Sequence, residues 1–217
     1  CAVSRDDDSS TVHTVTPIVL AAGAGTRFRD VGHKLTAALP ATARRPAEPV
    51  VSRAVAAACA ADLGPVVVVT GMLTAADLGL ADEPASSDQA QVITVHNHDW
   101  HAGQMTSVRA GLSIAASHGS DVAVVGLADQ PGVRPAAWRA VAAAADPTTP
   151  IAVATYDGRR GNPVALHHTI WDQLPSGGDE GARSLMRLRP ELVVEVPCSG
   201  SPTDIDTAED LRRWQSS

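Results

Sequence analysis

A run of small residues near the start of the sequence could bind an anion. It follows a short apolar segment, and together they read IVLAAGAGTRFRDVGHKL over residues 18–35. Alanine and glycine add little bulk, so the backbone N–H groups of residues 22–26 can approach a ligand, and glycine accepts the positive φ such a turn needs. Arg27 and Lys34 would neutralise that ligand, although cations of this kind are more often solvated surface charges. Alone, the loop fits a tight strand-to-helix turn equally well.

Two acidic residues from distant segments could supply a metal site beside this loop. Asp129 lies in GLADQPGV, next to a proline turn, and Asp206 lies in TDIDTAEDL near the C-terminus. Mg²⁺ is commonly held between one or two carboxylates and the phosphates of a substrate. The chemistry this predicts is phosphoryl or nucleotidyl transfer, with Arg27 and Lys34 as electrostatic clamps.

Both carboxylates also have plain structural interpretations. Asp129 could shape its own loop by bonding to nearby backbone. Asp206 could contribute to the start of a helix, where Thr207 is a candidate N-cap and Asp210 follows three residues later, a spacing similar to a capping box. The residue pattern alone does not choose between these roles and metal binding.

The elements that must position these residues alternate between strands and helices. Several expected strands are rich in Val and Ile and apolar on both faces, which is typical of parallel strands covered on both sides. This predicts an α/β fold with three layers, similar to a Rossmann fold, and a mostly parallel sheet whose ligands bind beyond the carboxyl ends of the strands. The expected strands are Thr16–Ala21, Pro65–Thr70, Gln91–His96, Asp121–Gly126, Pro150–Thr155 and Leu192–Val196, and the expected helices are Val50–Asp62, Met105–Ser117, Pro135–Ala145, Gly181–Leu188 and Thr207–Gln215. The segment HNHDWHAGQMTSV leads into one of these helices, whose first turn could offer N–H groups to a phosphate.

Length and composition narrow the class of protein. With 217 residues and 44% hydrophobic content, the chain fits one core. We expect residues 1–14 to form a flexible acidic leader and residues 15–217 a single domain. The net charge of −7 argues against nucleic-acid or membrane-surface binding. Three widely spaced cysteines without a CxxC pair imply neither disulfides nor zinc, so we expect a cytoplasmic protein. We expect no membrane span, because no apolar run approaches the roughly 20 residues that a span requires.

Six ordered motifs together resemble a known family. They read VLAAGAGTRF…HKL, NHDWHAGQMTSVRAGL, LADQPGV, GRRGNPVALH, GGDEGARSLM and DIDTAEDL. Their order is similar to that of the MobA-like nucleotidyltransferases, and most similar to the branch of molybdenum cofactor cytidylyltransferases. The resemblance runs from about residue 15 to residue 211. It implies a Mg²⁺-dependent transfer of CMP from CTP to molybdopterin, with release of pyrophosphate and with a molybdoenzyme as a further partner.

The resemblance also implies roles for individual residues. Arg27 and Lys34 would hold the triphosphate, and Asp129 and Asp206 would bind Mg²⁺. The catalytic residues would be Arg27, Lys34 and Asp129. The nucleotide site would comprise Leu20, Ala21, Ala22, Gly23, Ala24, Gly25, Lys34 and Ser107. The acceptor site would comprise Gly161, Asn162, Pro163, Gly178, Asp179 and Gly181.

Some positions depart from the family pattern and leave other functions open. Phe28 and Arg29 replace a common Met-Gly pair, ARRPAEPVV replaces the usual GRPLL, and Asn162 stands where histidine is common. The alternatives are use of GTP, a sugar phosphate or similar acceptor, and a non-catalytic module that delivers the finished cofactor to a molybdoenzyme. In the families that this chain resembles, guanylyltransferases tend to read LAGG and cytidylyltransferases LAAG. The resemblance therefore implies that Ala22, in LAAG, favours CTP over GTP.

Overall fold

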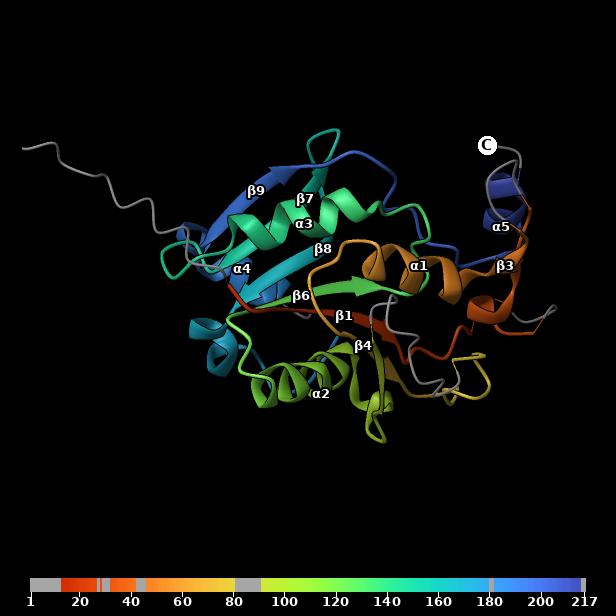
Figure 1. Cartoon of the computed structure of the whole chain (residues 1–217), viewed down its shortest axis with the longest axis horizontal. Coiled ribbons are helices and arrows are strands. Elements are labelled where there is room, and N and C mark those ends of the chain that lie inside the picture. Colours follow the sequence, from red (N-terminus) through yellow and green to blue (C-terminus); the bar gives the residue numbers. More distant parts are fainter. Residues whose placement is uncertain are drawn as a thin grey trace, which may run out of the picture.

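A seven-stranded sheet forms the centre of the protein (Figure 1). The computed structural model describes residues 13–26, 28, 32–41, 46–80, 91–179 and 182–215. The strands of this sheet are β1 (Val15–Ala21), β4 (Val66–Thr70), β5 (Val92–His96), β6 (Val122–Leu127), β7 (Ile151–Tyr156), β8 (Arg159–His167) and β9 (Val193–Pro197). Their order across the sheet is β5-β4-β1-β6-β8-β7-β9. Short strands β2 (Ala38–Leu39) and β3 (Glu48–Pro49) pair separately.

The helices follow the expected alternation. They are α1 (Val50–Cys59), α2 (Gln104–Ser117), α3 (Pro135–Ala144), α4 (Arg183–Leu188) and α5 (Ala208–Gln215), with 3-10 turns η1 (Lys34–Thr36), η2 (Trp100–Ala102), η3 (His168–Gln173) and η4 (Pro190–Leu192). Helix α1 is shorter than expected because the chain turns after Cys59 and Asp62 takes a positive φ of 54°.

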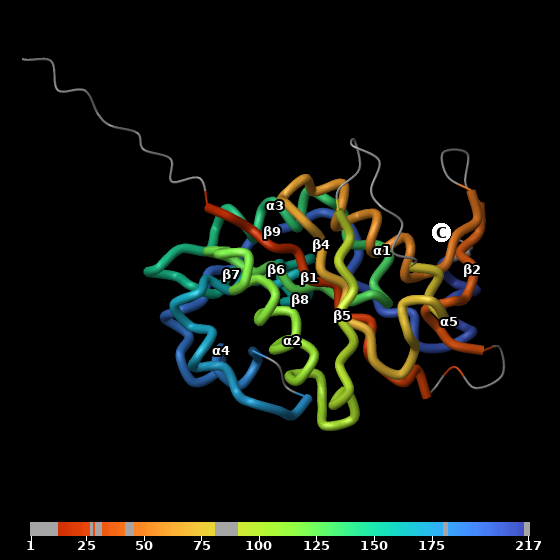
Figure 2. The backbone as a smooth tube through the Cα atoms, turned by 60° about the horizontal axis from the view of Figure 1, so that its bottom comes forward, coloured from red at the N-terminus to blue at the C-terminus, as the bar shows by residue number. Residues whose placement is uncertain are grey.

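Two apolar cores lie on opposite faces of the sheet. Val19, Val66 and Val68 point to the face covered by α1 and α3, whereas Ile18 and Val67 point to the face covered by α2. This alternation is the period-two pattern of strands buried on both sides. Figures 1 and 2 show α2 on the opposite side of β1 from α1 and α3. The α/β prediction with three layers and a mostly parallel sheet is confirmed.

Strand β8 is the strand of the seven-stranded sheet that the sequence analysis does not anticipate. The motif GRRGNPVALH is assigned there only to the acceptor, but Arg159–His167 forms a strand antiparallel to both β6 and β7. The turn that leads into it contains Asp157 and Gly158, both with positive φ. Because β8 runs backwards, Gly161 and Asn162 near its start lie at the edge where the parallel strands end.

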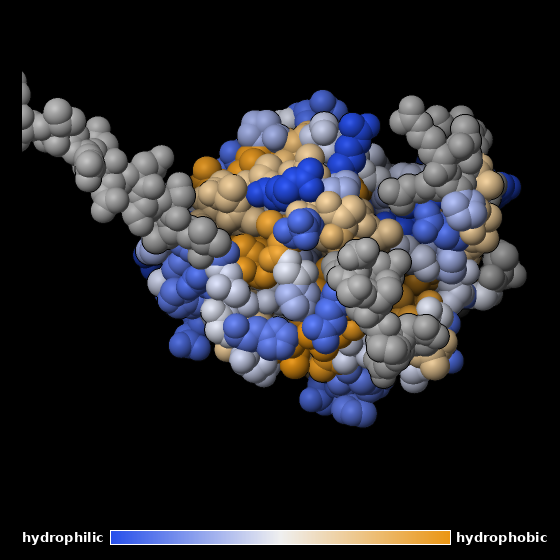
Figure 3. Space-filling view, viewed as in Figure 1, coloured by the Kyte–Doolittle hydropathy of each residue, from blue (hydrophilic) through white to orange (hydrophobic). Residues whose placement is uncertain are grey.

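This edge of the sheet collects the predicted site residues. Asp129 follows β6, the small-residue loop follows β1, and Asp206 precedes α5. Elsewhere, Figure 3 shows hydrophilic residues between small hydrophobic patches on the visible face. Among the helices of the described residues, none is long and apolar enough to cross a membrane. The proposed leader falls mostly on residues 1–12, outside the described residues, and its boundary at residue 15 remains a prediction.

Candidate active site

Two cavities adjoin at the carboxyl edge of the sheet. The first, of about 350 Å³, lies between β6, β8, α2 and α4 and is hereafter the arginine cavity. The second, of about 580 Å³, is lined by the small-residue loop and is hereafter the loop cavity. Leu20, Gln104 and Leu127 line both, so they form a shared wall. Two ligands bound in these cavities would lie side by side.

The loop after β1 lines the loop cavity as its composition predicts. All six residues from Leu20 to Gly25 line it, and so does Lys34. Gly25 has a φ of 59°, where a side chain would be strained and its Cβ would lie 2.9 Å from Nε2 of His33. The glycine therefore allows the loop to close on the segment that carries Lys34.

Lys34 lies between the two predicted metal-binding carboxylates. Its Nζ donates to Asp129 Oδ2 at 2.5 Å and to Asp206 Oδ1 at 2.7 Å, and all three side chains are largely shielded from solvent. Burial opposes the charge on the ammonium group, but the two carboxylates outweigh it and raise the pKa of Lys34. The three residues, 95 and 172 positions apart along the chain, thus form one charged cluster.

The structural alternatives for the two carboxylates do not account for their positions. Thr207 and Asp210 cap α5 between themselves, since Thr207 N donates to Asp210 Oδ2 and Asp210 N donates to Thr207 Oγ1. Asp206 gives its backbone N–H to this cap, while its carboxylate accepts from Lys34. Asp129 Oδ1 is buried and has no hydrogen-bond partner within the described residues. A buried carboxylate oxygen of this kind calls for a cation or donor, and none of the residues that the structure describes supplies one.

His33 connects the small-residue loop to Lys34, and the sequence analysis does not single it out. Its Nδ1 accepts from Leu35 N at 3.3 Å and caps η1, the turn that begins with Lys34. Nδ1 therefore carries no proton, so Nε2 is the N–H that donates to Gly23 O at 3.1 Å. The neutral imidazole fixes the loop and Lys34 relative to each other.

We expect His33 to make the stability of the protein sensitive to mild acid. Burial lowers the pKa of His33 below its ordinary value of 6.5. The unfolded chain therefore binds a proton before the folded chain does, and stability is lost as the pH falls from about 6.5 through the lower folded value. In urea unfolding between about pH 7.5 and pH 5, His33→Asn should lose less stability than the wild type. Parallel pH profiles for the two proteins would contradict this role.

The residues assigned to the acceptor divide between several places. Gly161 and Asn162 line the arginine cavity, whereas Asp179 lines the loop cavity. Pro163 is buried, and Gly178 packs so closely on Gly103 that a Cβ on Gly103 would lie 2.6 Å from the Gly178 carbonyl carbon. Only part of the acceptor set thus shares one cavity.

The start of α2 is covered, contrary to the expectation that its first turn offers N–H groups to a phosphate. Gln104 N donates to Asp179 Oδ1 at 3.2 Å, and Met105 N donates to Gly178 O at 2.9 Å. Ser107 lines the loop cavity, but its Oγ accepts from Asn97 Nδ2 at 2.9 Å. In this conformation, α2 contributes its side chains rather than its first N–H groups.

Two of the predicted site residues cannot be placed. Arg27 and Gly181 lie outside the described residues. Their assigned roles, in the triphosphate site and the acceptor site, remain predictions.

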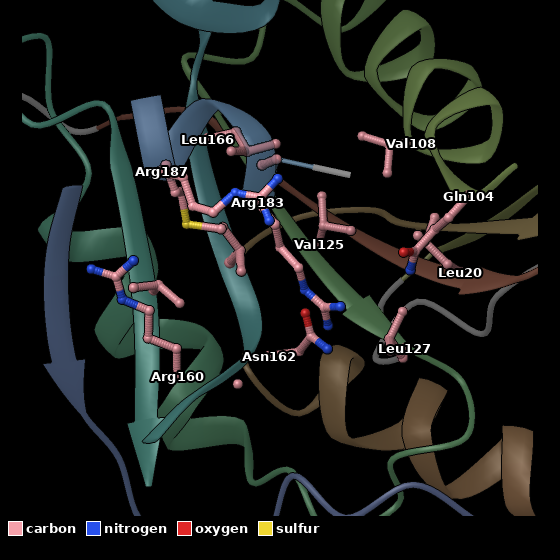
Figure 4. Close-up of a pocket in the computed structure, with 15 residues that line it drawn as sticks. Leu20, Gln104, Val108, Val125, Leu127, Arg160, Asn162, Leu166, Arg183 and Arg187 are labelled. Carbon is pink, nitrogen blue, oxygen red and sulfur yellow. The ribbon is translucent and has the colours of Figure 1, made fainter. Parts of the chain in front are cut away.

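The arginine cavity combines apolar walls with positive charge, and the sequence analysis misses its charged residues. Arg160 comes from β8, and Arg183 and Arg187 lie one helical turn apart on α4 (Figure 4). The apolar wall comprises Val108, Val125, Val153, Val164, Leu166 and Met186. Such a cavity can hold a ligand that combines an apolar body with an anionic group. The i, i+4 spacing of Arg183 and Arg187 in ARSLMR was the available signal.

Known proteins similar to this chain include one relative and two solved structures over nearly its full length. Nicotine blue oxidoreductase of Paenarthrobacter nicotinovorans is 32% identical over 210 residues, which cover 92% of this chain and 95% of the relative. A nucleotidyl transferase from Methanothermobacter thermautotroptrophicus has a TM-score of 0.71 and 25% identity, covering 94% of this chain and 96% of that chain. Rv0371c of Mycobacterium tuberculosis H37Rv, solved in complex with manganese, has a TM-score of 0.64 and 26% identity. The match covers 94% of this chain and 99% of Rv0371c.

A family model agrees with these similarities. The model of the MobA-like NTP transferase domain matches residues 17–195, from within β1 to within β9. This range includes the small-residue loop, Lys34, Asp129 and every residue that lines the arginine cavity. The chain therefore belongs to the family of MobA-like NTP transferase domains and has the α/β fold of a nucleotidyltransferase.

Proposed function

We propose that this protein is a Mg²⁺-dependent cytidylyltransferase that transfers CMP from CTP to molybdopterin and releases pyrophosphate. The observation that carries the proposal is the Lys34–Asp129–Asp206 cluster beside the small-residue loop, in a cavity that shares a wall with the arginine cavity. The loop cavity offers groups for a nucleotide triphosphate and its metal. The arginine cavity offers groups for a heterocyclic acceptor with a phosphate.

The cluster has the donor chemistry that Mg²⁺ requires. Asp129 and Asp206 already share one cation, the Lys34 ammonium, and Asp129 Oδ1 is buried without a partner among the described residues. Mg²⁺ is often bound by one or two carboxylates together with substrate phosphates, so two protein ligands suffice. The manganese complex of Rv0371c is consistent with a divalent cation in this fold. Bound Mg²⁺ would offset the charge that develops on the phosphates.

The protein's own residues would act by positioning and charge neutralisation. An oxygen of the acceptor phosphate attacks the α-phosphorus of CTP, the new P–O bond forms, and the bond to the β-phosphate oxygen breaks. Lys34 would leave the two carboxylates and bind the triphosphate when nucleotide and metal arrive. The loop N–H groups would hold the phosphates, and Arg183 would hold the acceptor. No general base is needed because a phosphate nucleophile is already anionic.

Ala22 supports the choice of CTP. Its side chain is buried in a tight contact, since a Cβ on neighbouring Gly71 would lie 2.7 Å from the Ala22 Cβ, and Met72 N donates to Ala22 O at 3.1 Å. The methyl group therefore packs against Gly71 and would stiffen the loop that lines the cavity proposed for the nucleotide. A single methyl contact discriminates by about 1–3 kcal/mol.

We therefore expect CTP to be used about 10- to 100-fold better than GTP, and Ala22→Gly to reduce this preference without reversing it. Competition between equal concentrations of the two nucleotides, with molybdopterin and Mg²⁺, gives the ratio of kcat/KM values. Ala24→Gly is the matched control, because it removes a methyl group from the same loop. A wild-type protein that uses GTP at least as well as CTP would refute the assignment.

The same assay tests the function itself. Pyrophosphate release from CTP that depends on both Mg²⁺ and molybdopterin supports the transferase. Tight binding of the cytosine dinucleotide cofactor without turnover would instead support a delivery module for a molybdoenzyme. Turnover with a sugar phosphate but not with molybdopterin would keep the reaction and replace the acceptor.

A second candidate function comes from the relative that is named as an oxidoreductase. Its 32% identity extends over 92% of this chain, so oxidation or reduction of nicotine blue is a specific alternative. The arginine cavity would then hold the compound to be reduced. Consumption of NADH or NADPH in the presence of nicotine blue, without any requirement for CTP, would favour this candidate over the transferase.

A further inference from the structure

Asn162 ends a chain of hydrogen bonds that begins at a carboxylate outside the arginine cavity. Gln130 Nε2 donates to Asp204 Oδ1 at 2.7 Å, and Asn162 Nδ2 donates to Gln130 Oε1 at 3.2 Å. Gln130 is only 6% exposed, so water has little access to its amide group. The three side chains come from the segment before α5, the turn after β6, and β8.

The carboxylate fixes the direction of every bond in this chain. An ionised carboxylate only accepts hydrogen bonds, so Gln130 must turn its NH₂ group towards Asp204. The carbonyl oxygen of Gln130 then faces Asn162, so Asn162 must donate a hydrogen bond to it from its own NH₂ group. The Oδ1 atom of Asn162 is consequently turned away from Gln130, and no donor to it is recorded among the described residues.

The backbone of Asn162 is also held in place. Tyr156 donates its hydroxyl to Asn162 O at 2.8 Å. The preceding Gly161 is confined as well, because a Cβ there would lie 3.0 Å from Pro202 Cβ and 3.2 Å from Tyr156 Cδ2. Side chain and backbone together therefore present the Asn162 oxygen in a fixed direction.

The oxygen lies among groups suited to a nitrogen heterocycle with an anionic substituent. Asn162 lines the arginine cavity, and in Figure 4 its oxygen points towards the end of the Arg183 side chain. The nearby wall is apolar and includes Leu127 and Val164. A carbonyl oxygen between apolar walls is satisfied only by a hydrogen-bond donor.

We propose that Asn162 Oδ1 selects the acceptor by accepting a hydrogen bond from a ring N–H or amino group, and that Asp204 and Gln130 set this polarity as positioning residues. The proposal deepens the proposed function, on which it rests, by specifying a pterin with an unsubstituted N–H edge. Arg183 supplies the charge for the anionic substituent of the same molecule. A pterin methylated at these nitrogens would leave the Asn162 oxygen buried and unpaired.

Reversing the polarity of the chain provides the test. In Asn162→Asp, the new carboxylate faces the Gln130 carbonyl oxygen, and in Asp204→Asn, the amide chain is free to flip and present an NH₂ group to the cavity. Asn162→Asp should weaken binding of a pterin phosphate by roughly 10- to 100-fold. Asp204→Asn should weaken it by only about twofold, because the orientation that presents the Asn162 oxygen stays accessible. In the double variant, Gln130 can reverse, so that its NH₂ group donates to the carboxylate introduced at position 162 and its oxygen accepts from the amide introduced at position 204. The carboxylate introduced at position 162 is then held by Gln130, as the Asn162 amide is in the wild type, and its accepting oxygen faces the cavity with the net charge unchanged.

The measurement is the dissociation constant of a phosphorylated pterin, which does not depend on turnover. We expect the double variant to recover at least about tenfold of the affinity lost in Asn162→Asp, because the two changes are coupled. The wild type should also bind an N-methylated pterin phosphate about 10- to 100-fold less tightly than the parent, and Asn162→Leu should lose this discrimination. Thermal unfolding and the dissociation constant of CTP report whether each variant is folded.

Additive defects in the double variant, or equal binding of the two pterins by the wild type, would overturn the inference. Should Asp204→Asn unfold alone, the comparison of Asn162→Asp with the double variant carries the same test. Failure of the transferase itself is recognised separately, as wild-type protein that binds the pterin but releases no pyrophosphate from CTP.

Discussion

Asp129→Asn is expected to lower kcat/KM for CTP by about 10³-fold or more while leaving the fold intact. The substitution keeps the shape of the side chain but removes the charge of the carboxylate whose Oδ1 is buried without a described partner. Loss of a metal ligand costs several kcal/mol of transition-state stabilisation, and each 1.4 kcal/mol is about a factor of ten. Pyrophosphate release measured over a range of Mg²⁺ concentrations gives both the rate and the apparent metal affinity.

The matched control is an acidic residue at the opposite edge of the sheet. Asp146 lies between α3 and β7 and accepts from the N–H groups of Thr148 and Thr149. Asp146→Asn should keep wild-type activity, although it weakens its turn. For Asp129→Asn, the midpoint of thermal unfolding should change by no more than about 4 °C. Near wild-type activity of Asp129→Asn at limiting Mg²⁺ would remove this residue from the metal site.

Lys34→Met is expected to lower kcat/KM for CTP by about 10²- to 10³-fold, the loss typical when one charged group that stabilises a transition state is removed. Methionine preserves most of the side-chain volume, so the effect reports the charge. The same variant should bind Mn²⁺ more tightly than the wild type when no nucleotide is present. This follows because Lys34 Nζ and a metal ion compete for the same two carboxylates, Asp129 and Asp206.

Metal titration and steady-state kinetics on one preparation separate the two effects. Arg189→Met serves as the control, since it removes a cation that forms an exposed ion pair with Glu191 near η4. Arg189→Met should change neither the affinity for Mn²⁺ nor kcat/KM for CTP. If Lys34→Met binds Mn²⁺ no better than the wild type, the lysine does not stand in for the metal. If it also retains full activity, Lys34 has no part in the triphosphate site.

The sheet was predictable because its central parallel strands are buried on both faces. Val66–Thr70 and Val122–Leu127 are nearly continuous apolar runs, and little else in a chain of this size satisfies such a pattern. Strand β8 was missed because Gly161 and Pro163 interrupt its sequence, which disfavours an internal strand. The Asp157–Gly158 pair was the usable signal, since Asp-Gly between two apolar runs is typical of a tight hairpin turn.

The site was only partly predictable for a different reason. The residue types and motifs identify Lys34, Asp129 and Asp206 as chemically suitable for a metal and triphosphate site. The distances between these side chains, however, depend on how three separate loops of the chain fold. Spacing along the chain therefore could not indicate that the lysine lies between the carboxylates. The chain of hydrogen bonds from Asp204 to Asn162 was likewise hidden, because the motif LADQPGV contains Gln130 but does not indicate its contacts with Asp204 and Asn162.

The wall shared by the two cavities makes each proposed substrate part of the other's surroundings. Leu20, Gln104 and Leu127 would contact both CTP and the pterin, so either ligand, once bound, completes the enclosure of the second. Binding should then be synergistic, and thermodynamic linkage requires the factor by which CTP tightens the pterin to equal the factor by which the pterin tightens CTP. Turnover would proceed through a ternary complex, and initial-rate plots for the two substrates would intersect rather than run parallel.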